Sequence, residues 1–146
     1  MVYSTTTLPK VVDALAVSAG TAGKNPLLDV TLPTFSLAYA WEKSYLAVRR
    51  MATGSERLQI RIGAAFTSSL CLLNRENVTP DILRRVHAVR ERLTCIPAKF
   101  GEGNVAATAA LMHDDEALSI AEEIVDIFDA IAKLYGVQKV ARPSEF

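Results

Sequence analysis

The apolar stretch near the middle of the chain is the feature that most restricts its fold. It spans Leu58–Leu73, with the sequence LQIRIGAAFTSSLCLL, and carries no charge from Ile62 onward. At about 100° per residue, its apolar side chains point in almost every direction around a helix, and such a helix must be covered by its neighbours. The sequence therefore predicts an all-α, single-domain bundle of five or six helices around this buried central helix.

Charged residues on both sides of this stretch argue against a membrane span. A transmembrane helix needs about 20 apolar residues, whereas Arg57, Arg61 and Arg75 bracket a shorter run. Within it, Gly63 and Thr67 lie four residues apart, and this pairing of small residues allows a neighbouring helix to approach closely. We therefore expect a core helix in water with one tightly packed neighbour.

Thr, Pro and Gly residues predict where the other helices begin and end. Thr caps free backbone N–H groups, and Pro fits the first turn of a helix. Thr53 and Glu56 match a capping box before the central helix, Asn104 is placed to cap the following short segment, and Gly136 is placed to end the last helix. The predicted helices cover residues 8–19, 32–51, 58–73, 80–96, 105–113 and 115–135. Residues 1–135 are then the helical domain, and 136–146 are an exposed polar tail.

Charge is balanced overall but unevenly distributed along the chain. The formal net charge is zero, yet residues 1–100 contain 13 Lys and Arg against 7 Asp and Glu, while residues 101–146 contain 3 against 9. Either the acidic last helix neutralises the earlier helices inside the fold, or each half is presented to a different partner.

The basic region suggests nucleic-acid binding as an alternative function. Residues 49–99 hold ten basic side chains against four acidic ones, and such a region can follow a phosphate backbone. Its candidate contact residues on the fourth predicted helix are Arg84, Arg85, Arg90 and Arg92. These arginines point in several directions around the helix, so salt bridges to the last helix are the favoured use for them.

Two short stretches resemble a known family. Cys95–Gly103, with the sequence CIPAKFGEG, resembles the serine-isoleucine-proline and alanine-glutamate-glycine motif of the small four-helix-bundle proteins encoded in ribosomal RNA intervening sequences. Trp41–Ser44 resembles the tryptophan-x-lysine-serine of their first helix. The resemblance implies a ring-forming bundle with a nucleic-acid partner. It covers less than a tenth of this chain, and an extra helix separates the two stretches, so we do not assign the chain to that family.

No arrangement of residues typical of an active site is found in the sequence. Glu122, Asp126 and Asp129 share the outward side of the last predicted helix, whereas a di-iron bundle needs inward Glu residues and Glu-x-x-His pairs. His87 has no acid or nucleophile placed beside it by spacing, and the acidic residues after His113 are typical of a helix N-terminus. We therefore predict no catalytic residue, no metal site and no cofactor, and keep an enzyme with an unrecognised active site as a second alternative.

Cys71 and Cys95 are expected to be buried free thiols, because a bundle of this size has no need of a disulfide. The first ten residues lack the basic start and long apolar run of a signal peptide, so the cytoplasm is the expected location.

The second predicted helix carries more apolar surface than one core face requires. Its core stripe is expected to be Leu37, Ala38, Trp41, Tyr45, Val48 and Ala52. A second set, Phe35, Tyr39 and Leu46, lies more than a quarter-turn away. This set either contacts the first helix and the connector or forms a docking patch for another chain. We therefore predict a non-enzymatic interaction or assembly module that binds a protein partner or itself.

Overall fold

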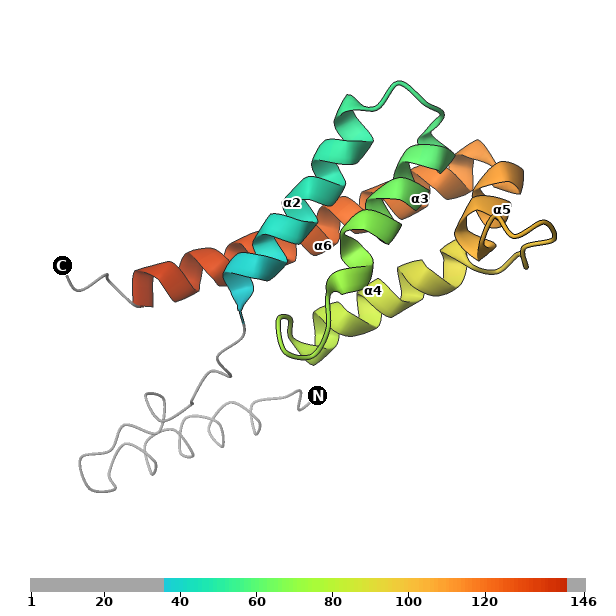
Figure 1. Cartoon of the computed structure of the whole chain (residues 1–146). Coiled ribbons are helices and arrows are strands. Elements are labelled where there is room, and N and C mark those ends of the chain that lie inside the picture. Colours follow the sequence, from blue (N-terminus) through green and yellow to red (C-terminus); the bar gives the residue numbers. More distant parts are fainter. Residues whose placement is uncertain (1–35, 142–146) are drawn as a thin grey trace, which may run out of the picture. The chain divides into compact units, whose positions relative to one another are not determined.

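The computed structural model describes residues 36–141, and these residues form one all-helical bundle (Figure 1). The elements are α2 (Leu37–Thr53), α3 (Leu58–Ser68), the short 3₁₀ helix η1 (Leu70–Leu72), α4 (Pro80–Leu93), α5 (Asn104–Leu111) and α6 (Asp114–Ala141). The all-α class of the prediction is confirmed. Among the described residues, no helix combines the length and the apolar character that crossing a bilayer requires.

The predicted central helix lies in the middle of the bundle as α3, which contacts α2, α5 and α6. Its core face buries Ile62, Ala65 and Phe66. Two details differ from the prediction. The helix ends at Ser68 and the chain continues as η1, and the opposite side of α3 is open to solvent, with Ile60 49% exposed.

Helix α6 is the longest element and contacts α2, α3 and α4. Its buried row follows a three-four spacing: Ala117, Ile120, Ile124, Ile127 and Ile131. The four isoleucines in this row are fully buried, and burial of each contributes about 1.5–3 kcal/mol relative to exposure. The bundle core therefore depends on α6 as much as on α3.

The buried face of α2 is rotated from the predicted stripe. The residues that face the core are Leu37, Ala40, Ser44, Ala47 and Met51. Ala38, Tyr45 and Ala52 are exposed, so their predicted place in the core is wrong. Small side chains at 40, 44 and 47 let α2 lie close to its neighbours, and the Ser44 hydroxyl is satisfied because it donates to the Trp41 carbonyl oxygen at 3.0 Å.

A buried glutamine ties α3 to the start of α6. The Gln59 side chain is 2% exposed, and its Nε2 donates to the Met112 carbonyl oxygen at 3.2 Å and to Asp114 Oδ1 at 2.6 Å. A buried amide without such partners would destabilise the fold by about 1–3 kcal/mol, so this contact fixes the register of the two helices.

Some predicted helix ends are correct and others are wrong. Thr79 Oγ1 accepts a hydrogen bond from the Ile82 backbone N–H at the start of α4, as expected. The capping box before α3 is absent: the Thr53 hydroxyl donates to the Arg49 carbonyl oxygen, and Glu56 bonds to Arg50 at 2.8 Å. Each polar group found a partner on α2 itself.

The predicted helix end at Gly136 is also wrong, because α6 continues to Ala141. Gly136 has no positive φ angle, unlike Gly101 and Gly103, and a single glycine costs a helix only about 1 kcal/mol relative to alanine. The division into a domain and a polar tail stays a prediction. The predicted helix 8–19, the start of the second predicted helix and residues 142–146 lie outside the described residues.

Candidate interaction surfaces

The seam between α4 and α6 is bridged by charged side chains. Arg85 Nε donates to Glu123 Oε1 at 2.7 Å, and Arg92 Nε donates to Glu116 Oε1 at 2.8 Å. Arg92 also donates to Ser119 Oγ at 3.0 Å. The bond to Glu123 raises the pKa of Arg85, and the bond between Arg92 and Glu116 raises the pKa of Arg92 and lowers that of the carboxyl group. The acidic last helix therefore neutralises part of the basic region within the fold.

The four candidate phosphate-binding arginines do not form one surface. Arg84, Arg85 and Arg92 line a shallow groove of about 350 Å³, together with Asp81 and Glu123. The groove is thus mixed in charge, and Arg84 already bonds to Asp81 at 2.7 Å. The remaining arginine, at position 90, is exposed and does not line this groove.

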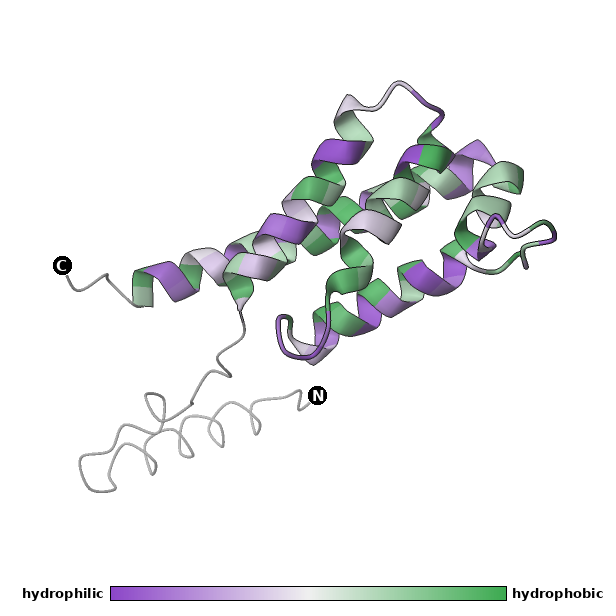
Figure 2. Cartoon of the chain, viewed as in Figure 1, coloured by the Kyte–Doolittle hydropathy of each residue, from purple (hydrophilic) through white to green (hydrophobic). Residues whose placement is uncertain are grey.

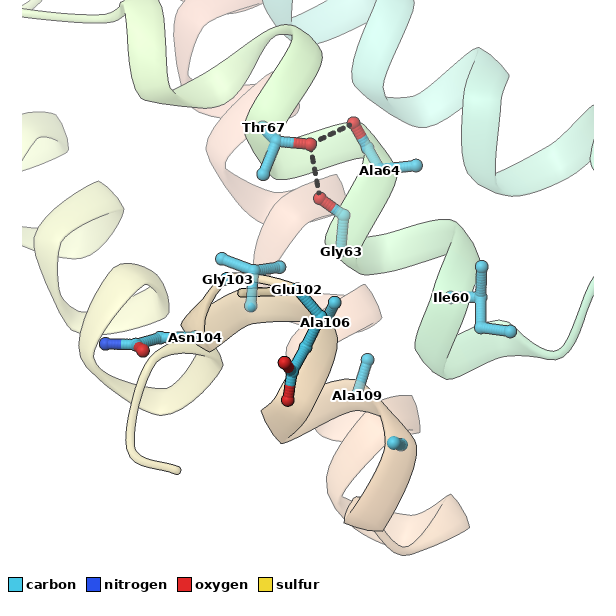
Figure 3. Close-up of a pocket in the computed structure, with 11 residues that line it drawn as sticks. Ile60, Gly63, Ala64, Thr67, Glu102, Gly103, Asn104, Ala106 and Ala109 are labelled. Atoms are coloured by element: carbon cyan, nitrogen blue, oxygen red, sulfur yellow. Dashed lines mark hydrogen bonds between the residues drawn. The ribbon is translucent and has the colours of Figure 1, made fainter. Parts of the chain in front are cut away.

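A second groove, of about 580 Å³, lies between α3 and α5 (Figure 3). Its walls carry mostly small or apolar side chains: Ile60, Gly63, Ala64, Thr67, Val105, Ala106, Ala109 and Ala110. A Cβ atom added to Gly63 would lie 3.1 Å from Val105 Cγ1. The predicted close approach of a neighbouring helix at Gly63 is therefore confirmed, with α5 as that neighbour.

The polar groups at this groove are already bonded. The Thr67 hydroxyl donates to the Gly63 carbonyl oxygen at 3.0 Å (Figure 3). Asn104 Oδ1 accepts from the Ala98 N–H at 2.9 Å, so this side chain binds the preceding loop and its predicted role as a helix cap is wrong. Glu102 accepts from the Lys99 and Phe100 N–H groups, and bonds to backbone N–H lower the pKa of its carboxyl group. The groove offers apolar contact and no reactive pair.

The α2–α6 face is different, because aromatic rings line it. The Trp41 and Tyr45 rings are stacked, with centroids 5.5 Å apart. Tyr135 lies 5.9 Å from Trp41, and Phe128 lies 6.4 Å from Tyr45. Tyr45 remains 41% exposed. This row of rings therefore forms part of the surface as well as the contact between the two helices.

Helix α6 carries a second apolar stripe beside these rings. It follows a three-four-three-four spacing: Leu118, Ala121, Val125, Phe128 and Ala132. The stripe lies about 100° around the helix from the buried row. Leu118 and Val125 are 54% and 44% exposed. We call the surface formed by this stripe together with Trp41, Tyr45 and Tyr135 the open face.

Acidic side chains flank the open face. A shallow hollow of about 300 Å³ at the Leu118 end of the open face is lined by Leu118, Ala121, Val125 and two exposed acids, Glu122 and Asp126. Asp115 and Asp129 are on the same side of α6, by helical spacing. Lys133 is the basic residue at the end of this flank, and it bonds to Asp129 at 2.5 Å. On α2, the exposed charged residues nearest Tyr45 along this side are Glu42, which bonds to Lys43 at 3.3 Å, and Arg49.

The predicted docking patch is only partly described. Tyr39 is 36% exposed and its ring lies 5.1 Å from Lys43 Nζ, while Leu46 is half-buried. Phe35 lies outside the described residues. By helical spacing, Tyr39 points about 120° away from Tyr45 around α2, so the patch is separate from the open face and stays a prediction.

The remaining reactive side chains are dispersed. His87 and His113 are exposed, and neither lines the α3–α5 groove. Cys71 and Cys95 are exposed free thiols, so their predicted burial is wrong. Cys71 lies in η1, and Cys95 follows the end of α4. Within residues 36–141, no group of three or more His, Cys, Asp or Glu is placed to hold a metal ion.

Comparison with known proteins provides no further assignment. No family model, no curated protein and no solved structure matches the chain.

Proposed function

We propose that the chain is a non-enzymatic interaction module, and that its open face binds an amphipathic helix from another chain. The observation that carries the proposal is the second apolar stripe of α6. It gives α6 apolar surface well beyond the row that α2, α3 and α4 cover. Contiguous apolar surface that is rimmed by charge is typical of protein-interaction sites.

The shape of the open face favours a helical partner. Two neighbouring helices present rings and aliphatic side chains along their shared seam, and an amphipathic helix places its own apolar side chains into such a seam at spacings of three and four. Trp41 and Tyr45 supply large rigid contact surfaces of the kind that dominate binding energy in interfaces. A cytoplasmic location, expected from the sequence, stays part of this proposal.

Nucleic-acid binding remains the alternative with less support. The side chains of Arg85 and Arg92 bond to carboxylates of α6, so they are not free to bind the phosphates of a nucleic acid. The self-association expected from the sequence is one form of the proposal, in which the bound helix comes from a second copy.

A peptide titration tests the proposed function. The probe is an amphipathic helix of about 20 residues, roughly 30 Å long, with leucine at heptad positions and glutamine elsewhere. Trp41 is the only tryptophan, so its fluorescence reports binding at the open face directly. We expect saturable binding that the variant Leu118→Glu/Val125→Glu loses.

The matched control is Ile60→Glu/Leu111→Glu, which adds two acids at exposed apolar positions outside the open face. This variant should bind as the unchanged protein does. Equal loss in both variants, or no binding by the unchanged protein and no concentration-dependent sedimentation, would contradict the proposed function.

A further inference from the structure

We infer that the open face selects a basic amphipathic helix, and that the acidic flank of α6 is its specificity element. This inference rests on the proposed function and concerns the same surface. It specifies that the partner helix carries positive charge.

The distribution of acids on α6 carries the argument. Glu116 and Glu123 turn toward α4 and bond to Arg92 and Arg85. Glu122 and Asp126 form no ion pair with α4, although Asp126 adds to the effect of Glu123 in raising the pKa of Arg85. Both side chains line the hollow beside Leu118 and Val125. The buried isoleucines of α6 would be equally well covered if neutral residues stood at positions 122 and 126. Folding of the bundle therefore does not require these two negative charges.

The charges are unevenly distributed along the open face. On α2, Glu42 bonds to Lys43, and Arg49 is exposed. At the Tyr135 end of α6, Lys133 bonds to Asp129, and Lys139 lies 5.1 Å from the Tyr135 ring. At the Leu118–Val125 end, Asp115, Glu122 and Asp126 form no ion pair with any residue of 36–141. Complementary charge along the rim of an interface sets orientation and excludes partners of the wrong sign. A helix that lays leucine-type side chains on the stripe therefore gains further contacts if lysine or arginine flanks its apolar row.

The same pattern argues against a symmetric pairing of two copies through α6. In a parallel pair each acid meets its own copy. An antiparallel pair centred near Asp126 and Ile127 brings Glu122 of one copy near Lys133 of the other, but it also places the two Asp126 side chains near each other. Like charges placed across an interface are unfavourable, so a basic partner is favoured over a second copy as the occupant.

Three peptides of equal length test the inference on the full chain. They share the leucine row of the neutral peptide and carry lysine, glutamine or glutamate on the other positions. We expect the lysine peptide to bind at least about ten-fold more tightly than the glutamate peptide at low salt, because several rim charges each contribute a small amount. The difference should shrink toward 1 M salt, where the screening length falls to about 3 Å.

Charge reversal on the protein provides the second arm. Glu122→Lys/Asp126→Lys should reverse the preference, so that the glutamate peptide becomes the tighter ligand. The matched control, Glu76→Lys/Glu91→Lys, changes two exposed acids away from the open face and should leave the preference intact. A lysine peptide with the same composition but a scrambled leucine row reports adsorption by charge alone and should not bind.

The outcomes separate this inference from the proposed function. Equal affinity for the three peptides, lost only in Leu118→Glu/Val125→Glu, would overturn the inference and leave the proposed function intact. Binding of the scrambled lysine peptide with equal affinity would overturn it as well. Failure of all peptides to bind would remove both.

Discussion

Helix α6 meets α4 on one side and α2 on another, and the two contacts are built differently. Against α4, Arg85 and Arg92 reach across the seam and bond to Glu123 and Glu116. Against α2, four aromatic rings pack with centroids 5.5–6.4 Å apart, yet Tyr45 and the neighbouring aliphatic stripe stay accessible. Figure 2 shows how apolar and polar residues alternate along α4 and α6.

The charged residues on the two sides of α6 have different surroundings. The α4 side uses basic and acidic residues to neutralise each other over a buried apolar row. The open face keeps its apolar side chains half-exposed, and Glu122 and Asp126 beside them form no ion pair with α4. Ion pairs cross the contact between α4 and α6, whereas the contact between α2 and α6 leaves part of its apolar surface exposed.

The largest expected effect separates the interior of α6 from its open face. Ile124→Ala should lower the free energy of unfolding by about 2–5 kcal/mol, because it leaves a cavity in the core. Val125→Ala, the next residue, should change it by less than about 0.5 kcal/mol, as is usual at a surface position. Chemical denaturation of both variants measures the contrast, and similar losses would show that the open face is covered.

A second test compares the arginines of the α4 side. Arg85→Ala and Arg92→Ala should each lower the free energy of unfolding by about 0.2–1 kcal/mol, the usual range for partly exposed ion pairs. Arg84→Ala and Arg90→Ala should have smaller effects, since the pair of Arg84 and Asp81 is about three-quarters exposed. Equal effects at all four positions would contradict the distinction between bridging and surface arginines.

The pH dependence of the stability tests the same contact between α4 and α6. The hydrogen bond from Arg92 lowers the pKa of Glu116 below its ordinary value of 4.5, so the pair stabilises the fold above that pH, and the stability is lost as pH falls through the lowered pKa. The stability difference between the unchanged protein and Arg92→Ala should therefore shrink on acidification below pH 4.5. Urea titrations at a series of pH values measure it. A difference that persists unchanged at the lowest pH would assign the effect of Arg92 to packing.

Nucleic-acid binding gives the smallest expected effect. Arg84→Glu/Arg90→Glu reverses the two arginines that do not bond to α6, so folding should be preserved. We expect little change in retention on heparin and no shift of labelled RNA or DNA with either protein. A strong shift that this variant abolishes would favour nucleic-acid binding and show that the exposed arginines of α4 form a binding surface.

The sequence predicts much of the fold because the relevant signals are local. The three-four spacing of Ile124, Ile127 and Ile131 and the Thr79–Pro80 start of α4 are visible without coordinates. Errors arose where packing decides. On α2, the alanines at 40 and 47 form the core face because α3 and α6 come close. The predicted core stripe was wrong because it followed the larger side chains, such as Tyr45. Gly136 lies inside α6 because no residue near it requires a turn.

The open face could be predicted only in part. Apolar residues cover a wide arc of α6, but their spacing alone does not say which part of that arc stays uncovered. Likewise, the basic region was visible in the sequence. The bonds of Arg85 to Glu123 and of Arg92 to Glu116 were not, because they depend on how α4 lies against α6. The open face is defined by what the other helices leave exposed.

The most direct test of the central claim is a map of where a helix binds. Backbone amide NMR spectra of the full chain, recorded during titration with the lysine peptide, locate the contact residue by residue. We predict shifts concentrated on α2 around Tyr45 and on α6 from Leu118 to Ala132, with few along α4. Shifts confined to the α3–α5 groove or to the arginines of α4 would contradict the claim that the open face is the binding surface.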